Sequence, residues 1–222
     1  YAFFYLSYYH QGNTIMFTTE DTATLLQIMK ARRDVRGNKF IQQEVEQEKL
    51  HMILEAGMTA PSVGYSQPWK FVVIKDEDIK KSILENFEEE NTKAKEIFQD
   101  KELYTQLKLE GIQEAPLNIA VLYEANEENI LGMTSMKKMG EYSVVCAIQN
   151  MWLMARTLNI GLGWVSILNE KKVLQTLKAK PNAQLIAYLC LGYVNEFYQE
   201  SELKTLGWEK EKNFDACITY KG

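Results

Sequence analysis

Three arginines and one aspartate lie within five residues of the chain, in the sequence Arg32-Arg33-Asp34-Val35-Arg36. Guanidinium groups stay charged at all relevant pH and grip phosphate oxygens in a bidentate fork, so the cluster predicts a phosphate site at a helix end. The alternative is a solvated helix end whose cations complement the helix dipole. A carboxylate repels a phosphate and would weaken a site that only binds phosphate, so we expect Asp34 to have a second function.

A second candidate region is the loop at 60–69, with the sequence Ala-Pro-Ser-Val-Gly-Tyr-Ser-Gln-Pro-Trp. Two prolines and a glycine predict a loop, which leads into a buried strand at 70–74. Small residues let the backbone approach a flat ligand, while Ser62 and Gln67 offer a hydroxyl and an amide to its polar edge. An ordinary turn is the alternative.

A third candidate region, Gly-Leu-Gly-Trp-Val-Ser-Ile-Leu at 161–168, follows an apolar helix predicted at 142–158. The helix is apolar almost all round, which indicates burial on most sides. Gly161 is expected to be the left-handed residue that stops the helix. Gly163 is expected to open a short strand whose backbone approaches a ligand.

The remaining pattern predicts the elements that carry these regions. Thr19 is expected to cap a first helix that ends at Arg32. Asn169 is expected to cap a later helix. Other segments are a helix at 44–57, a charge-rich helical excursion at 77–111, strands at 117–123 and 184–194, and a C-terminal arm from 195. We expect one domain over 18–222, preceded by an aromatic extension at 1–17. If Met16 is the natural start of the protein, residues 1–15 are non-native.

Composition excludes several classes of protein and site. A net charge of -5 and a pI near 5.3 argue against a general nucleic-acid binder. Cys146, Cys190 and Cys217 show no CxxC spacing, which suits a reducing cytosol, and the first two are expected to be buried thiols. Two histidines leave little room for a triad or a metal centre. We expect a cytoplasmic protein without metal, membrane or nucleic-acid partners.

Taken together, these motifs resemble the nitroreductase superfamily of FMN-binding proteins over about residues 20 to 200. The arginine cluster, the APSVGYSQPWKF loop, the GLGWVSIL stretch and the LCLGYV strand keep the family's order. The chain is particularly similar to the branch of BluB-type 5,6-dimethylbenzimidazole synthases. Asp34 stands where ordinary nitroreductases carry Ser, Tyr65 replaces Asn, and Ser166 follows Gly163-Trp164-Val165; the segments 108–112 and 198–200 are also similar to that branch.

The resemblance implies an α+β fold with a mixed sheet flanked by helices, in an intertwined homodimer with FMN at the interface. The arm would wrap across the other subunit, and the excursion would be a lid or a dimer arm. The matching positions imply FMN contacts from Arg32, Arg33, Asp34, Val35, Arg36, Ser62, Gly64, Tyr65, Gln67, Leu109, Gly163, Trp164, Val165 and Ser166. Because Glu209 follows Gly207-Trp208, where the family often has a basic residue, no cofactor role is expected for the tail.

The implied activity is the O2-dependent fragmentation of reduced FMN to 5,6-dimethylbenzimidazole, the lower ligand of cobalamin, and erythrose 4-phosphate. Asp34 would act as general acid/base or position the ribityl chain, and the Ser166 hydroxyl would form a hydrogen bond with the flavin edge. Alternatively, Asp34 only pairs with Arg33 or Arg36, and Ser166 only satisfies a backbone group. A separate flavin reductase would supply reduced FMN. Two other functions remain open, an NAD(P)H-dependent nitro- or flavin reductase and a non-catalytic flavin-binding protein.

Overall fold

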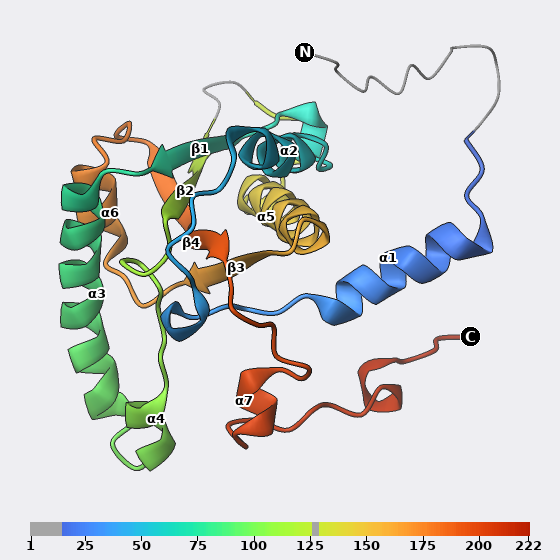
Figure 1. The fold of residues 1–222 in the computed structure, drawn as a ribbon. Coiled ribbons are helices and arrows are strands. Elements are labelled where there is room, and N and C mark those ends of the chain that lie inside the picture. The colour runs from blue at the N-terminus through green and yellow to red at the C-terminus, as the bar shows by residue number, and fades with distance from the viewer. Residues whose placement is uncertain (1–14, 126–128) are drawn as a thin grey trace.

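The computed structural model describes residues 15–125 and 129–222, and the predicted extension at 1–17 falls almost wholly outside this part of the chain (Figure 1). Among the described residues, four strands form one sheet with the order β1-β2-β4-β3. The strands are β1 (Trp69–Ile74), β2 (Leu117–Glu124), β3 (Ile160–Val165) and β4 (Ala183–Tyr193).

Helices cover both faces of this sheet. Alternate residues of a strand point to opposite faces, so Ile119 and Val121 of β2 pack toward one core, while Ala120 and Leu122 pack toward another. The first core also contains α2 (Gln47–Met58) and α5 (Met139–Thr157); the second contains α3 (Glu77–Ile97) and α6 (Glu170–Thr176). The predicted α+β class with flanking helices is therefore confirmed.

The pairing of the strands differs from the expected mixed sheet. Each neighbouring pair of strands is antiparallel. Parallel pairing within the described residues is limited to a single bridge between Asp34 and Leu162, beside the edge strand β3. The arginine cluster therefore lies against the sheet edge without extending into a fifth strand.

Gly163 makes this close approach possible. The Val35 amide donates to the Leu162 carbonyl oxygen at 3.1 Å, which places the Val35 carbonyl directly over β3. A Cβ atom at position 163 would lie 2.0 Å from that carbonyl oxygen. Gly163 was expected to open the strand and to let a ligand approach. It lies inside β3, and the group that approaches it here is the Val35 carbonyl of the same chain, so the ligand contact stays a prediction.

Gly161 does not end the preceding helix, contrary to the sequence-based expectation. It lies within β3, and Asn159 adopts the left-handed conformation there, with φ 56°. Asn tolerates this region better than most residues, so the turn does not need a glycine. A Cβ at Gly161 would instead meet the side chains of Val194 and Val35, at 2.5 and 3.1 Å.

The first helix, α1 (Thr19–Ala31), begins one residue earlier than predicted, with Thr18 as its cap. The Thr18 hydroxyl accepts from the Asp21 amide, and the Asp21 carboxylate accepts from the Thr18 amide, which forms a capping box. No residue of α1 is buried, and its apolar Leu25, Leu26 and Met29 are about half exposed. The helix projects from the body of the single chain (Figure 1).

α5 also leaves one face uncovered, although its sequence predicted burial on most sides. Tyr142, Val145 and Cys146 recur at helical spacing and are exposed. The expectation of a buried Cys146 thiol is therefore wrong, whereas Cys190 in β4 is buried as expected. None of the helices in the described part of the chain is long and apolar enough to cross a membrane.

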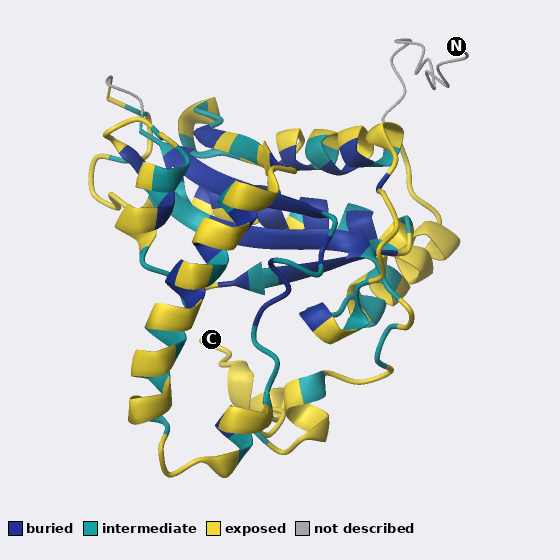
Figure 2. Cartoon of the chain, turned by 60° about the vertical axis from the view of Figure 1, so that its left-hand side comes forward, coloured by how far each residue is buried: buried dark blue, intermediate teal, exposed yellow. Residues whose placement is uncertain are grey.

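The excursion and the arm extend from the end of the molecule that carries the arginine cluster. After α3, the excursion continues through α4 (Glu102–Gln106), and the arm contains α7 (Glu202–Thr205). The sheet is buried, whereas the outer part of α3 and the C-terminal tail are mainly exposed (Figure 2). Both segments therefore lie at the rim of the structure.

Replacement of Gly163 by Ala tests the importance of the close approach to β3. The new Cβ would meet a backbone oxygen that cannot rotate away, so we expect Gly163→Ala to lower the free energy of unfolding by more than about 3 kcal/mol. Gly161→Ala is the matched control in the same strand, because its Cβ meets side chains that can shift, at a cost of about 1–3 kcal/mol. Urea unfolding of both variants measures the difference, and equal losses would contradict this account.

Candidate active site

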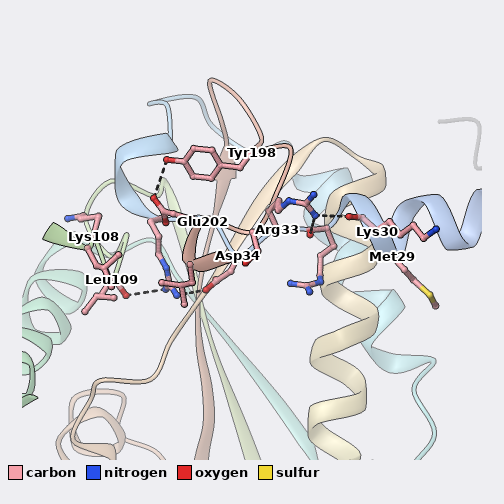
Figure 3. Close-up of a pocket in the computed structure, with 13 residues that line it drawn as sticks. Met29, Lys30, Arg33, Asp34, Lys108, Leu109, Tyr198 and Glu202 are labelled. Atoms are coloured by element: carbon pink, nitrogen blue, oxygen red, sulfur yellow. Dashed lines mark hydrogen bonds and ion pairs between the residues drawn. The ribbon is translucent and has the colours of Figure 1, made fainter. Parts of the chain in front are cut away.

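A cavity of about 220 Å³ lies beside the arginine cluster. The C-terminal turn of α1, the segment after it, the end of the excursion and the start of the arm enclose it (Figure 3). It is lined by Met29, Lys30, Arg32, Arg33, Asp34, Arg36, Leu107, Lys108, Leu109, Tyr198, Ser201, Glu202 and Leu203. Four residues of the predicted cluster and Leu109 are therefore brought together, while Val35 is not among the lining residues.

Arg36 and Asp34 form an ion pair that is anchored to the backbone of β3 and of the excursion. Arg36 Nη2 donates to Asp34 Oδ2, and Arg36 Nη1 donates to the carbonyl oxygens of Leu109 and Trp164, at 3.1 and 3.2 Å. The Trp164 amide in turn donates to Asp34 Oδ1 at 3.0 Å. Both side chains are thus held in one orientation, and the pairing of Asp34 with Arg36 that we considered as an alternative does occur.

Arg33 and Arg32 retain donors for a ligand. Arg33 Nη1 donates to the carbonyl oxygens of Lys30 and Arg32 at 2.6 Å each, and Nη2 donates to that of Gln199. Arg33 Nε is buried and has no hydrogen-bond partner among the described residues. The Arg32 guanidinium lies 4.8 Å from the centre of the Trp152 ring and makes no ion pair with a described residue.

The charges around the cavity favour an anion. Five cationic side chains line it, those of Lys30, Arg32, Arg33, Arg36 and Lys108, against the carboxylates of Asp34 and Glu202. Lys108 is partly neutralised from outside the cavity, because its ammonium pairs with Glu110 and with Glu114, the latter at 2.6 Å. A positive excess still remains, as a bound phosphate requires.

The environment of Asp34 shifts its pKa upward. Burial raises the pKa of the Asp34 carboxyl above its usual range, and the charge of Arg36, the Trp164 amide and the charge of Arg32 only partly oppose the rise. A carboxyl that is held beside a cationic cavity and takes up a proton more readily than usual is suited to proton transfer.

The predicted site residues of β3 face different environments. Val165 is 2% exposed and packs in the core, and Val35, which lies beside β3, is 5% exposed, so neither can offer its side chain to a ligand at the cavity. Trp164 is only partly buried, but its main-chain amide and carbonyl are already bonded to Asp34 and Arg36. Ser166 is exposed and directly follows β3.

The predicted loop residues Ser62, Gly64, Tyr65 and Gln67 do not join the arginine cluster within one chain. The Val63 amide donates to Ser143 Oγ near the start of α5, whereas Trp152 Nε1, nine residues later, donates to the Arg33 carbonyl. A rise of 1.5 Å per residue separates these two anchor points by about 14 Å along the helix axis.

The backbone of this loop is strained. Gly64, Tyr65 and Gln67 have φ values of 54°, 54° and 46°, which residues other than glycine rarely adopt. The Ser62 hydroxyl accepts from the Gln67 amide at 3.0 Å and so helps to hold the shape. Tyr65 is 84% exposed. Strain of this kind persists where the surroundings impose it and often marks ligand sites.

Sequence reasoning missed much of the wall formed by the arm. Tyr198, Ser201, Glu202 and Leu203 line the cavity of their own chain, and the Tyr198 hydroxyl donates to Glu202 at 3.2 Å. The similarity of residues 198–200 to the synthase branch was the available signal, but composition gave them no chemical role. Within the described residues, no group of three or more His, Cys, Asp or Glu could hold a metal ion.

Replacement of Asp34 by Asn should change the dependence of stability on pH. Because the pKa of Asp34 is higher in the folded than in the unfolded state, its protonation stabilises the folded state. This stabilisation is complete below the unfolded pKa of about 4 and is lost as pH rises through the folded-state pKa. We therefore expect Asp34→Asn to gain stability relative to the parent protein between about pH 4 and pH 7, as measured by urea unfolding.

Asp21→Asn provides a control with the opposite sign. The capping bonds from Thr18 lower the pKa of Asp21, so its contribution is present above the unfolded pKa and is lost as pH falls. Relative to the parent protein, this variant should be less stable by a constant amount between about pH 4 and pH 7, and the difference should shrink only as pH falls below about 4. Parallel pH profiles for the two variants would show that the environment of Asp34 is not as described.

Comparison with known proteins identifies relatives of the chain. The profile of the Nitroreductase family matches residues 29–193. A 5,6-dimethylbenzimidazole synthase of Rhodospirillum rubrum is 37% identical over 185 residues, which cover 82% of this chain and 87% of that protein. These matches confirm the resemblance to the synthase branch and the expectation of an oxidoreductase of that type.

Solved structures show the same fold. A BluB-like flavoprotein from Clostridium difficile 630 aligns with a TM-score of 0.67 and 20% identity, over 89% of this chain and 99% of that one. An iodotyrosine deiodinase bound to FMN and 3-iodo-L-tyrosine aligns with a TM-score of 0.68 and 19% identity, over the same shares. With a family profile that covers most of its length and a fold shared with these structures, this chain belongs to the nitroreductase family.

Proposed function

We propose that this protein is a 5,6-dimethylbenzimidazole synthase that fragments reduced FMN with O2, releasing the benzimidazole and erythrose 4-phosphate. One observation carries the proposal. Asp34, a carboxyl with a raised pKa, is fixed by Arg36 and the Trp164 amide inside a cationic cavity. The synthase from Rhodospirillum rubrum, 37% identical to this chain, supports the assignment.

The residues at the cavity fit the phosphate end of FMN. The orphaned Arg33 Nε and the Arg32 guanidinium without an ion pair supply charged donors that no described group satisfies. Charge-assisted bonds from guanidinium to phosphate are among the strongest in proteins. We assign Arg32, Arg33 and Arg36 to the phosphate and ribityl chain.

The ring end of the site requires a second subunit in this proposal. Gly163 and Ser166 would lie beside the ring in one subunit, and the strained loop with Ser62, Gly64 and Gln67 would reach it from the other. The exposed apolar faces of α1 and α5 supply surface for a homodimer contact. A two-fold interface would bring the opposite ends of the two α5 helices together, as this arrangement needs.

In the reaction, reduced FMN supplies both the electrons that react with O2 and the atoms of the benzimidazole. Asp34 holds and transfers a proton at its carboxyl oxygens, because burial raises its pKa and so favours uptake of a proton more than in water. Arg36 fixes the orientation of the Asp34 carboxyl, and the exposed Ser166 hydroxyl forms a hydrogen bond with the edge of the flavin ring. Tyr65 and the excursion limit the access of solvent. A separate flavin reductase in the same cytoplasmic compartment supplies the reduced flavin.

A single-turnover reaction tests the activity. Protein loaded anaerobically with reduced FMN and then exposed to air should form 5,6-dimethylbenzimidazole, identified by chromatography and mass. Asp34→Asn should still bind FMN but lower the rate of product formation, measured as the product yield at a fixed short time, about 100-fold or more, the usual contribution of a general acid or base. The exposed Asp215→Asn variant is the matched control and should react as the parent does.

Assays with NADPH and with FMN alone identify the alternatives. Steady NADPH oxidation without added flavin reductase and without loss of the ring would show a nitro- or flavin reductase. Tight FMN binding with neither turnover nor cleavage would show a flavin-binding protein. An unchanged product yield in Asp34→Asn would remove Asp34 from the chemistry.

Mixed dimers test whether two subunits share each site. Arg33→Ala and Gln67→Asn would each inactivate both sites of a homodimer, whereas a mixed dimer would contain one site with both changes and one intact site. Random mixing should therefore restore about a quarter of the sites. Product assays before and after subunit exchange measure this recovery. No recovery, with mixed dimers shown by mass spectrometry, would mean that both groups act within one chain.

A further inference from the structure

We infer that Trp208 is a positioning residue, which holds the arm against the excursion and thereby closes the cavity. Two walls of the cavity are involved. The excursion wall consists of Leu107, Lys108 and Leu109; the arm wall consists of Tyr198, Ser201, Glu202 and Leu203. They belong to segments about 90 residues apart in the sequence, and a direct contact between these segments helps to keep the two walls together.

Trp208 makes such a contact with the excursion. Its ring lies edge-on to that of Phe98, with centroids 5.6 Å apart, and 6.1 Å from that of Tyr104. Phe98 and Tyr104 stack on each other at 4.9 Å, and Lys101 Nζ lies 4.3 Å from the centre of the Trp208 ring. Such aromatic and cation–π contacts are favourable beyond the area that they bury. We call these four residues the aromatic cluster.

Each side of the aromatic cluster is one backbone hydrogen bond away from a wall of the cavity. On the arm, the Trp208 amide donates to the carbonyl oxygen of Leu203 at 2.9 Å. On the excursion, the Leu107 amide donates to the carbonyl oxygen of Tyr104 at 3.3 Å. The contact between Trp208 and Tyr104 therefore links Leu203 of one wall to Leu107 of the other through two backbone hydrogen bonds.

The local chain is shaped to place Trp208 in this position. Gly207 follows α7 with φ 75°, a left-handed conformation that reverses the chain after a helix. Tyr104 is buried, and its hydroxyl donates to Asn91 Oδ1 at 2.8 Å, which fixes the ring on α3. Trp208 thus docks on a rigid partner, although the neighbouring Glu209 and Lys210 are exposed.

The inference predicts faster opening of both walls when Trp208 is truncated. In ligand-free protein, Trp208→Ala should raise the rate of amide hydrogen exchange about ten-fold in 103–109 and 198–206, a change of about 1.4 kcal/mol. Exchange in β2 and β4 should not change. Trp208→Phe retains an aromatic ring and should restore most of the protection. Phe214→Ala, an exposed aromatic of the same tail, is the matched control and should behave as the parent.

Binding measurements connect this opening to the cavity, and this step rests on the proposed function. FMN should dissociate several-fold faster from Trp208→Ala than from the parent, with recovery in Trp208→Phe. Lys101→Ala is a milder test and should increase the rates of hydrogen exchange and of FMN dissociation by smaller factors. If Trp208→Ala fails to fold, the result for Lys101→Ala tests the inference in its place.

The outcomes separate the two proposals. Unchanged exchange in Trp208→Ala, or in Lys101→Ala if that variant must be used, overturns the inference. Faster exchange with unchanged FMN release also overturns it, because the contact would then not govern the cavity. If the parent protein fails to bind FMN, the proposed function is wrong, while the exchange experiment still decides whether the aromatic cluster joins the two walls.

Discussion

The candidate site depends on one backbone contact, the approach of Val35 to β3 at Gly163. The hydrogen bond from Val35 to Leu162 adds the arginine cluster to the edge of the sheet, and only a residue without a side chain leaves room for the Val35 carbonyl. Asp34 and Arg36 then point to the same side of this short segment, as alternate residues of an extended chain do. The rigid sheet thus fixes the positions of a carboxylate and a guanidinium that would otherwise lie on a mobile loop.

Around that contact, the Asp34 carboxylate pairs with Arg36, but some guanidinium donors of the arginine cluster have no partner among the described residues. Arg36 is oriented by Asp34 and two carbonyl oxygens, which use three of its five N–H donors, and Arg33 and Arg32 also keep donors for another anion. Asp34 receives two bonds, yet burial still raises its pKa. The site therefore combines a structural ion pair with adjacent groups available for binding, a division of tasks consistent with the proposed synthase.

The sequence allowed the main elements and the grouping of the arginines to be predicted, because both depend on local patterns. Strand and helix periodicity located β2, β4 and α5 within a few residues, and residue types alone suggested the anion site. Features decided by tertiary contacts were less accessible. The left-handed turn at Asn159, the exposed Cys146 and the antiparallel sheet depend on which surfaces meet, and one sequence does not contain that information. The aromatic cluster was missed for the same reason, since Phe98 and Trp208 come together only in the folded chain.

The lack of buried residues in α1 has a thermodynamic consequence. Isolated helices of 13 residues are marginal in water, and most helices gain their stability by packing. In a homodimer of the proposed kind, the other subunit would supply that packing, and the end of α1 carries the arginines to the cavity. Subunit association and anion binding would then be linked, so that each strengthens the other by the same free energy. The affinity of this protein for its ligand would accordingly rise with its own concentration.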